Sequence, residues 1–383
     1  MKKIAVVTAT RAEYGLLSPV IRALRRYEDQ GLTVHLVVTG THLSEDYGMT
    51  EHEIAERIDR RIPIPVRSGS ALDISKNQAE ALVRFTALFL EEKYAGVVLL
   101  GDRYEALAVA VAAGNTRTPV FHLCGGDTTQ GALDEWIRHA ITKISYLHFV
   151  SNDESMRRVI QLGEDPERVY NVGSTSIDNI LTVADMTKRE ALESVGLSEC
   201  RYALCTYHPV TTEGGSVDGP VLQFLDAVRA FPELTFIVTK SNADQGGARI
   251  NALLDEAAQT IGNLRVFTSL GVRRYLSLMR YAEFVLGNSS SGIIETPAFH
   301  VPTVDIGDRQ KGRLRCDSVI NCKPDTTSII SAINTAMSDA HRKVCASVTS
   351  PYGDGHAAER IACKIADRVI SGRIDLKKRF YDL

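Results

Sequence analysis

The residues best suited to chemistry lie in a polar stretch that follows a short apolar run. Residues 122–143 read His-Leu-Cys-Gly-Gly-Asp-Thr-Thr-Gln-Gly-Ala-Leu-Asp-Glu-Trp-Ile-Arg-His-Ala-Ile-Thr-Lys. They leave an expected buried strand at 119–123, pass through a Gly-Gly loop and enter an expected helix. Asp134 and Arg138 are four residues apart and therefore lie on one face of the helix start. Asp134 is predicted either to transfer a proton or to cap the helix and pair with Arg138.

Two further carboxylates follow expected strands of the same half of the chain. Asp102 comes after the apolar run 96–100, and Asp127 lies in the Gly-Gly loop. The carboxyl ends of parallel strands meet at one edge of a sheet, where ligands usually bind. We therefore expect Asp102, Asp127 and Asp134 to gather at that edge and to include the acid and base of a reaction.

The second half carries a run of small polar residues, Asn288-Ser-Ser-Ser-Gly-Ile-Ile-Glu295. Serine hydroxyls and backbone N–H groups at a helix start form an anion site, and Gly292 would let a diphosphate approach the backbone. Glu295 is expected to accept hydrogen bonds from the two hydroxyls of a ribose. The alternative is a capping box in which Glu295 only supports the helix.

Basic residues near a Gly-rich turn and one histidine complete the candidate set. Arg309, Lys311 and Arg313 could clamp phosphate, or form a solvated basic loop. His208 follows a strand and precedes a proline, which suits either a structural role or the protonation of a leaving phosphate.

Alternating apolar runs and helical patterns predict the elements that position these residues. Strands are expected at 3–8, 33–39, 96–100, 119–123, 146–150, 169–172, 202–206, 234–238, 264–267, 284–286 and 301–306. Helices are expected at 17–27, 51–58 and 79–93, and from residue 357. This pattern predicts an α/β protein of two Rossmann-like domains facing a cleft. The chain has no G-x-G-x-x-G, so neither a dinucleotide fingerprint nor a P-loop is expected.

Length and composition agree with two domains. A chain of 383 residues with 44% hydrophobic and 24% charged residues is typical of a globular protein with more than one core. We expect an N-terminal domain over 1–175 that carries the carboxylates and a nucleotide-binding domain over 176–365. The hinge is expected near 173–185, and a C-terminal helix within 366–383 is expected to pack back on the first domain.

Charge, apolar runs and cysteines exclude several classes of protein. A net charge of −3 without a basic run argues against nucleic-acid binding. No apolar stretch approaches the ~18 residues of a membrane span, and the N-terminal apolar run is expected to be a strand, not a signal peptide. Seven cysteines without Cys-x-x-Cys spacing predict free thiols, no metal site and a cytoplasmic location.

Taken together, the motifs resemble those of the hydrolysing UDP-N-acetylglucosamine 2-epimerases nearly end to end. The matching segments are Thr10-Arg-Ala-Glu-Tyr-Gly, Gly101-Asp-Arg, Gly125-Gly-Asp, Asp134-Glu-x-x-Arg-His-Ala-Ile-Thr-Lys, His208-Pro-Val-Thr, Gly287-Asn-Ser-Ser-Ser-Gly-Ile-Ile-Glu and Pro351-Tyr-Gly-Asp-Gly. The resemblance implies a glycosyltransferase-B-like fold, a homodimer or homotetramer, and no metal or other cofactor. Family members release UDP and N-acetylmannosamine for sialic acid synthesis. A sister branch treats 2,4-diacetamido-2,4,6-trideoxy sugars similarly, on the way to legionaminic acid.

The resemblance also implies a mechanism and assigns roles to residues. A base takes the proton at C2 while UDP leaves C1, and water then adds to the resulting 2-acetamidoglucal with inversion at C2. Asp102 and Asp134 would be the acid/base residues, and His208 would assist the departing diphosphate. The residues implied to bind UDP are Arg11, Arg103, Asn242, Ser289, Ser290, Glu295 and Arg309.

The chain departs from the family pattern on both sides of its Gly-Gly pair. Glutamates are usual at these two positions in the sialic acid branch, whereas this chain has Cys124 and Asp127. A thiol at a buried strand end usually acts as a small hydrophobe and does not replace a carboxylate base. Either Asp127 takes the role, or Asp102 and Asp134 suffice, or the sugar differs.

Three other interpretations are open. A non-hydrolysing UDP-GlcNAc epimerase should have an Ala-Gly-Leu-Arg type of sequence in the Gly-Gly loop. The helix at 134–143 argues against a glycosyltransferase of the same shape. A nucleotide-sugar-binding protein that has lost its chemistry through Cys124 is less favoured, because Asp102, Asp134 and His208 are all present.

Overall fold

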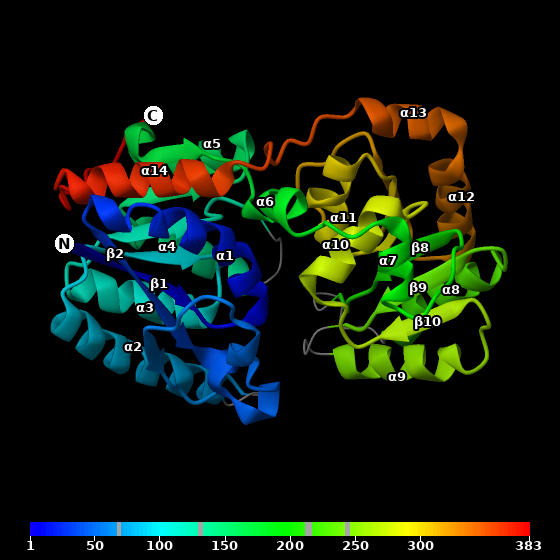
Figure 1. Ribbon diagram of the computed structural model, residues 1–383, viewed down its shortest axis with the longest axis horizontal. Helices are drawn as coiled ribbons and strands as arrows, with labels where there is room; N and C mark the ends of the chain where they lie inside the picture. Colours follow the sequence, from blue (N-terminus) through cyan, green and yellow to red (C-terminus); the bar gives the residue numbers. More distant parts are fainter. Residues whose placement is uncertain (67–69, 129–132, 211–216, 242–245) are drawn as a thin grey trace. The chain divides into compact units, whose positions relative to one another are not determined.

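The chain folds into two compact units. The computed structural model describes residues 1–66, 70–128, 133–210, 217–241 and 246–383 (Figure 1). Among them, unit 1 contains Met1–Thr128, Leu133–Asp178 and Tyr352–Leu383, and unit 2 contains Asn179–Pro351. The sequence-based boundary near 175 lies close to this division. Residues 352–365, however, were expected in the second domain and lie in unit 1.

Unit 1 is built on a seven-stranded parallel sheet with the order β3-β2-β1-β4-β5-β6-β7. Its strands are β1 Lys2–Thr8, β2 Leu32–Thr39, β3 Arg60–Ile62, β4 Gly96–Leu100, β5 Val120–Leu123, β6 Leu147–Val150 and β7 Val169–Asn171. Val6 of β1 pairs with Leu36 on one side and Val98 on the other. The strand order therefore reverses between β1 and β4, the position where doubly wound sheets bind ligands.

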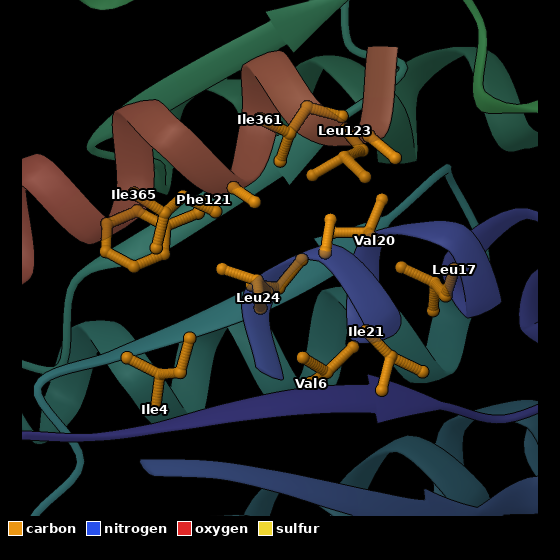
Figure 2. Close-up of a cluster of buried hydrophobic side chains, with 14 of the residues drawn as sticks. Ile4, Val6, Leu17, Val20, Ile21, Leu24, Phe121, Leu123, Ile361 and Ile365 are labelled. Carbon is orange, nitrogen blue, oxygen red and sulfur yellow. The ribbon is translucent and has the colours of Figure 1, made fainter. Parts of the chain in front are cut away.

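Helices cover both faces of this sheet. They are α1 Arg11–Arg25, α2 Ala71–Glu92, α3 Tyr104–Asn115, α4 Leu133–Ile144, α5 Asp153–Gln161 and α14 Ala357–Ile370, while α6 Thr175–Thr182 begins in unit 1 and ends in unit 2. Side chains alternate along β1, so Ile4 and Val6 face the core shared with α1 and α14. Ala5 and Val7 face the core shared with α2, α3 and α4. Figure 2 shows the first of these cores.

The last helix belongs to unit 1 because of its packing and its cap. Ile361 and Ile365 of α14 are buried in the same core as α1. The first two N–H groups of α14, from Ala357 and Ala358, donate to the carboxylate of Asp178 at 3.2 and 2.8 Å. Asp178 thus supplies the partners that a helix N-terminus lacks.

Unit 2 repeats the architecture with six parallel strands in the order β10-β9-β8-β11-β12-β13. The strands are β8 Tyr202–Thr206, β9 Thr235–Thr239, β10 Leu264–Phe267, β11 Val285–Gly287, β12 Thr303–Ile306 and β13 Val319–Cys322. The helices are α7 Lys188–Glu193, α8 Asp218–Arg229, α9 Gly247–Ala258, α10 Gly271–Tyr281, α11 Ser291–Ile294, α12 Thr326–Met337 and α13 Asp339–Ser347. The prediction of two Rossmann-like α/β domains is confirmed.

Several local predictions were wrong. The helix expected at 51–58 is a short 3₁₀ turn, Thr50–Glu53, followed by strand β3, which was not predicted. Contacts from α1 fix this segment in a non-helical path: the Ala55 N–H donates to the Tyr14 hydroxyl at 2.8 Å. Strand β13 was also missed, since its side chains are only partly buried and it lacks a clear apolar run. Helix α1 starts six residues earlier than expected, because Thr10 accepts the Glu13 N–H and caps it.

Among the described residues, no helix is long and apolar enough to cross a membrane. All seven cysteines are free thiols, as predicted.

Two buried carboxylates hold an arginine at the reversal point of unit 1. Glu13 Oε2 accepts the Ala9 N–H at 2.7 Å, and its Oε1 lies 3.9 Å from Arg103 Nε. Arg103 Nε also donates to Glu105 Oε2 at 3.3 Å. Glu13 is 8% exposed and Glu105 1%, and Oε1 of each is buried without a hydrogen-bond partner among the described residues. Burial raises the pKa of Glu13 from 4.5 to about 7, against the opposing charge of Arg103.

The raised pKa of Glu13 predicts a pH-dependent stability. Unfolded Glu13 ionises at its ordinary pKa, so its contribution to the free energy of unfolding is present below pH 4.5 and is lost as the pH rises through about 7. The loss should amount to roughly 3 kcal/mol. Chemical denaturation at pH 5 and pH 8 should show that Glu13→Gln, which cannot ionise, removes this part of the pH dependence.

Glu359 supplies a matched control, because it is an exposed glutamate paired with Arg26 at the surface. Glu359→Gln should keep the pH dependence of the wild type. A Glu13→Gln protein with unchanged pH dependence would contradict the assignment.

Candidate active site

Arg138 of α4 holds together the loops of unit 1 that carry the predicted carboxylates. Its side chain is 3% exposed. Its Nε donates to Asp102 Oδ2 at 2.9 Å, and Nη2 binds the same oxygen. Its Nη1 donates to the backbone oxygen of Asp127 at 2.7 Å and to Glu135 Oε2 at 3.0 Å. One guanidinium therefore fixes the loop after β4, the loop after β5 and the first turn of α4.

Asp102 and Asp134 occupy different environments around this arginine. Asp102 has a side chain 27% exposed, and its Oδ1 forms no hydrogen bond with the described residues. It can therefore accept a proton while Oδ2 stays anchored. Asp134 is exposed in the first turn of α4. It lies four residues before Arg138, about 6 Å along the helix axis.

Asp127 is held by hydroxyl groups. Its Oδ1 accepts hydrogen bonds from Ser155 Oγ at 2.6 Å and Ser151 Oγ at 3.1 Å. The preceding Gly126 has a φ of +80°, and a Cβ there would lie 2.3 Å from the Ser155 carbonyl oxygen. Only glycine fits this approach, so the Gly-Gly loop is fixed against α5.

Cys124 has an unusual backbone conformation. Its φ is +63°, in the left-handed region that few non-glycine residues adopt. Its N–H donates to the Phe149 carbonyl at 2.9 Å, which continues the pairing at the end of β5. The side chain is half-buried and packs against the core around α1 and α14, as expected of a small hydrophobe.

The two predicted nucleotide-binding arginines of unit 1 follow β1 and β4. Arg11 is half-exposed and forms a loose ion pair with Glu53 at 3.7 Å. Arg103 is held at Nε by Glu13 and Glu105, with 44% of its side chain exposed. Its two terminal nitrogens form no hydrogen bonds with the described residues. Arg103 therefore presents a held guanidinium fork of the kind that binds phosphate.

In unit 2, an amide bridges the strand-order reversal between β8 and β11. Asn288 Oδ1 accepts the His208 N–H at 2.7 Å, and Asn288 Nδ2 donates to the His208 carbonyl at 2.8 Å. Gly287 allows this approach, since its φ is +142° and a Cβ would lie 2.0 Å from the Thr206 oxygen. Asn288 thus acts as a double clamp on the backbone of His208.

His208 is buried and electrically neutral at pH 7. Burial lowers the pKa of its imidazole to about 4, with a further contribution from the positive charge of Arg309. The Nδ1 lies 3.2 Å from the hydroxyl of Ser241, whose own backbone is held by Asn251. The ring is therefore fixed and can donate or accept at Nε2.

The serines after β11 form a chain of hydroxyl groups. Ser291 Oγ donates to Ser289 Oγ at 3.2 Å, and the Tyr275 hydroxyl lies 2.7 Å from Ser291 Oγ. Ser290 stands at the start of α11, where its side chain forms no capping bond. Helix α11 has only four residues, so the polar groups that characterise this segment are serine hydroxyls and not the N-terminus of a long helix.

Packing gives Gly292 a second role beside the predicted approach of a diphosphate. A Cβ on Gly292 would lie 2.9 Å from Thr303 Cγ2, so close packing on β12 already requires glycine here. The alternative capping box around Glu295 does not form, and its carboxylate bonds to none of the described residues. Burial raises the pKa of Glu295 to about 7. A half-buried carboxyl that bonds to no described residue suits the predicted contact with ribose hydroxyls.

The residues of the basic turn after β12 differ in whether they contact the serine segment. Arg309 Nη1 and Gln310 Nε2 both donate to the Asn288 carbonyl, at 3.1 and 2.8 Å, which ties this turn to the serine segment. Lys311 lies at the surface 4.0 Å from Asp308, as the solvated-loop alternative predicted. Asn242, the other predicted nucleotide ligand, falls outside the described residues.

Four residues that shape these sites were not predicted from the sequence: Glu13, Glu105, Ser241 and Gln310. Glu13 lies inside the Thr10-Arg-Ala-Glu-Tyr-Gly motif and Glu105 lies two residues after Gly101-Asp-Arg, but burial gives both their roles. Gln310 is adjacent to the predicted Arg309, and this position was the sequence signal that could have identified it. Among the described residues, no group of three or more His, Cys, Asp or Glu side chains could hold a metal ion.

Comparisons with curated proteins agree with the motifs. Residues 24–366 match the family model of UDP-N-acetylglucosamine 2-epimerase. The chain is 38% identical over 84% of its length to a GDP/UDP-N,N'-diacetylbacillosamine 2-epimerase (hydrolyzing) of Campylobacter jejuni, which it covers to 84%. It is 36% identical over its full length to polysialic acid biosynthesis protein P7 of Escherichia coli, which it covers to 98%.

Solved structures share the fold. The chain superposes with a TM-score of 0.82 on the UDP-GlcNAc 2-epimerase of Neisseria meningitidis bound to UDP-GlcNAc, at 19% identity. That alignment covers 96% of this chain and 100% of the other. A putative epimerase from Listeria monocytogenes gives a TM-score of 0.80 at 19% identity, with 100% and 99% coverage. From its sequence match and its fold, the chain belongs to the UDP-N-acetylglucosamine 2-epimerase family.

Proposed function

We propose that this protein is a hydrolysing nucleotide-sugar 2-epimerase. It converts a UDP-2-acetamido sugar into UDP and the free sugar of manno configuration, without a metal or other cofactor. The observation that carries the proposal is the Arg138 cluster, which anchors one oxygen of Asp102 and leaves the other open beside a helix that carries Asp134. Positioned carboxylates of this kind suit proton transfer at a sugar carbon.

The proposed reaction has two steps, an elimination of UDP and a hydration. A carboxylate removes the proton from C2, the C1–O bond breaks, and UDP leaves with the bonding electrons to give a 2-acetamidoglucal. Water then supplies a hydroxyl to C1 and gives its remaining proton to a carboxylate, while a protonated carboxyl supplies a proton to the opposite face of C2. Asp102 and Asp134 are assigned as the acid/base pair. Asp127 is a poorer candidate, because two serine hydroxyls already bind its carboxylate.

Unit 2 is proposed to hold the UDP part. The proposed ligands are Ser289, Ser290, Glu295 and Arg309, together with Asn242 and with Arg11 and Arg103 of unit 1. His208 is neutral before the nucleotide arrives, because burial and Arg309 keep its pKa low. A diphosphate at this ring adds negative charge, which raises the pKa of the imidazole and lets it stabilise the leaving group.

The sugar is proposed to be UDP-GlcNAc or its 2,4-diacetamido-6-deoxy relative. Two relatives named as hydrolysing N,N'-diacetylbacillosamine epimerases are 38% and 35% identical, whereas a UDP-N-acetylglucosamine 2-epimerase of N. meningitidis is 29% identical. Polysialic acid biosynthesis protein P7 is 36% identical, so identity alone does not choose between the two sugars. Cys124, in place of the usual glutamate, favours a substrate that differs from that of the sialic acid branch.

Proton NMR in D₂O tests the reaction with both sugars. UDP-GlcNAc and UDP-N,N'-diacetylbacillosamine are incubated separately with the purified protein. We expect free UDP and a free manno-configured sugar that carries deuterium at C2, formed faster from the diacetamido substrate. An intact UDP-linked manno product would instead identify a non-hydrolysing epimerase, and binding without turnover would identify a protein that has lost the activity.

Asp102→Asn and Asp134→Asn should each lower kcat by at least ~10²-fold while UDP still binds. The amide keeps the size of the side chain but cannot take a proton. Glu135→Gln is the matched control, since Glu135 also binds Arg138 and is not assigned to catalysis. Near-normal turnover in either Asp variant would remove that residue from the mechanism.

Cys124→Ala should keep most of the activity, because the thiol is assigned a packing role at the end of β5. Steady-state kinetics beside Cys363→Ala, which changes an exposed thiol, provides the comparison. A loss as large as that of Asp134→Asn would show that the thiol takes part in the chemistry.

A further inference from the structure

His122 is a fully buried histidine to which the proposed reaction assigns no role. It lies on β5, two residues before Cys124, and is 0% exposed. Burial lowers the pKa of its imidazole to about 3, and the positive charge of Arg138 acts in the same direction. The ring is therefore neutral at pH 7, with one nitrogen that donates a hydrogen bond and one that accepts.

One nitrogen of this ring binds the backbone next to Asp102. His122 Nε2 lies 2.8 Å from the carbonyl oxygen of Gly101, the residue directly before Asp102. A carbonyl oxygen only accepts hydrogen bonds, so Nε2 carries the proton. The N–H of Gly101 donates to the Leu123 carbonyl at 3.0 Å. Strand β5 therefore binds both backbone polar groups of Gly101, whose φ of +80° favours glycine at the end of β4.

The other nitrogen ties the ring to α4 and to the Gly-Gly loop. His122 Nδ1 lies 3.4 Å from Thr142 Oγ1, and that hydroxyl donates to the Arg138 carbonyl, one turn earlier, at 3.0 Å. A Cβ on Gly125 would lie 3.0 Å from both Nδ1 and Thr142 Oγ1, so a side chain there would crowd both groups. One neutral ring thus lies against the same three segments that the guanidinium of Arg138 joins: the loops after β4 and β5, and helix α4.

The bond to Gly101 fixes the backbone of Asp102. A peptide unit is planar, so the direction of the Gly101 carbonyl also sets the positions of the N and Cα atoms of Asp102. Arg138 anchors the far end of the same residue at Oδ2. We propose that His122 is a positioning residue of the reaction, whose Nε2–H holds Asp102 so that its open Oδ1 reaches the sugar. This inference rests on the proposed role of Asp102 as an acid or base.

Two amide substitutions separate this role from simple packing. The longer side chain of His122→Gln can place an N–H near the position of Nε2, whereas the shorter one of His122→Asn reaches only the position of Nδ1. His122→Asn should lower kcat at least ~10-fold, because a displaced acid or base reacts slowly, while KM and the Kd of UDP change less than about threefold. His122→Gln should recover most of kcat. UDP release from the faster of the two UDP-sugars, and calorimetric titration with UDP, give the readouts.

His35→Asn is the matched control and should keep kcat, because His35 is a half-buried histidine of the same sheet that bonds to Tyr94. Nitrogen-15 NMR of the wild type at pH 7 adds a readout that does not depend on turnover. It should show a neutral imidazole protonated at Nε2 whose signal is absent from His122→Gln.

The proposal is overturned by a proton on Nδ1 of His122, by normal kcat in His122→Asn, or by equal losses of kcat in the two amide variants. A wild type that releases no UDP contradicts the proposed function and this role with it, whereas the other outcomes contradict only this role.

Discussion

A guanidinium taken out of water must find partners for its charge and its five N–H groups, and this requirement organises unit 1. Arg138 is almost fully buried, and a buried cation without partners would cost several kcal/mol. Asp102, Glu135 and the Asp127 carbonyl meet that requirement. They come from three segments that a parallel sheet brings to one edge. The arrangement of the proposed acid/base residues is thus a consequence of solvating one charge inside the protein.

In unit 2, the loops at the strand-order reversal are joined through an uncharged side-chain amide. This amide belongs to Asn288 and bonds to both backbone polar groups of His208. Arg309 and Gln310 then bind the Asn288 carbonyl. No charge is buried by these bonds, so the site keeps its cations and its neutral imidazole available for an anion. Unit 1 therefore supplies the proposed acid/base carboxylates, whereas unit 2 supplies hydroxyls, an imidazole, a guanidinium and the carboxyl of Glu295.

Much of this could be predicted from the sequence, because long apolar strands and motif spacing are local properties. The main strands, the two Rossmann-like domains and the family all followed from such patterns. Short strands such as β3 did not, since three residues carry too little periodicity. The bond from Arg138 to Asp102, 36 residues away in the sequence, could not be read from the i, i+4 spacing, which indicates only partners within one helix. The raised pKa of Glu13 likewise depends on burial, which no single motif encodes.

The contact of Asp178 with the start of α14 affects the order in which the two units can fold while the chain is being synthesised. All of unit 2 lies between the two parts of unit 1 that this contact joins. On the ribosome, unit 2 is complete once residue 351 has emerged, while unit 1 still lacks the helix that covers Ile4 and Val6. The domain that starts first therefore finishes last. A nascent chain therefore exposes part of its first core until α14 has emerged, which makes unit 1 the part that depends on residues 352–383.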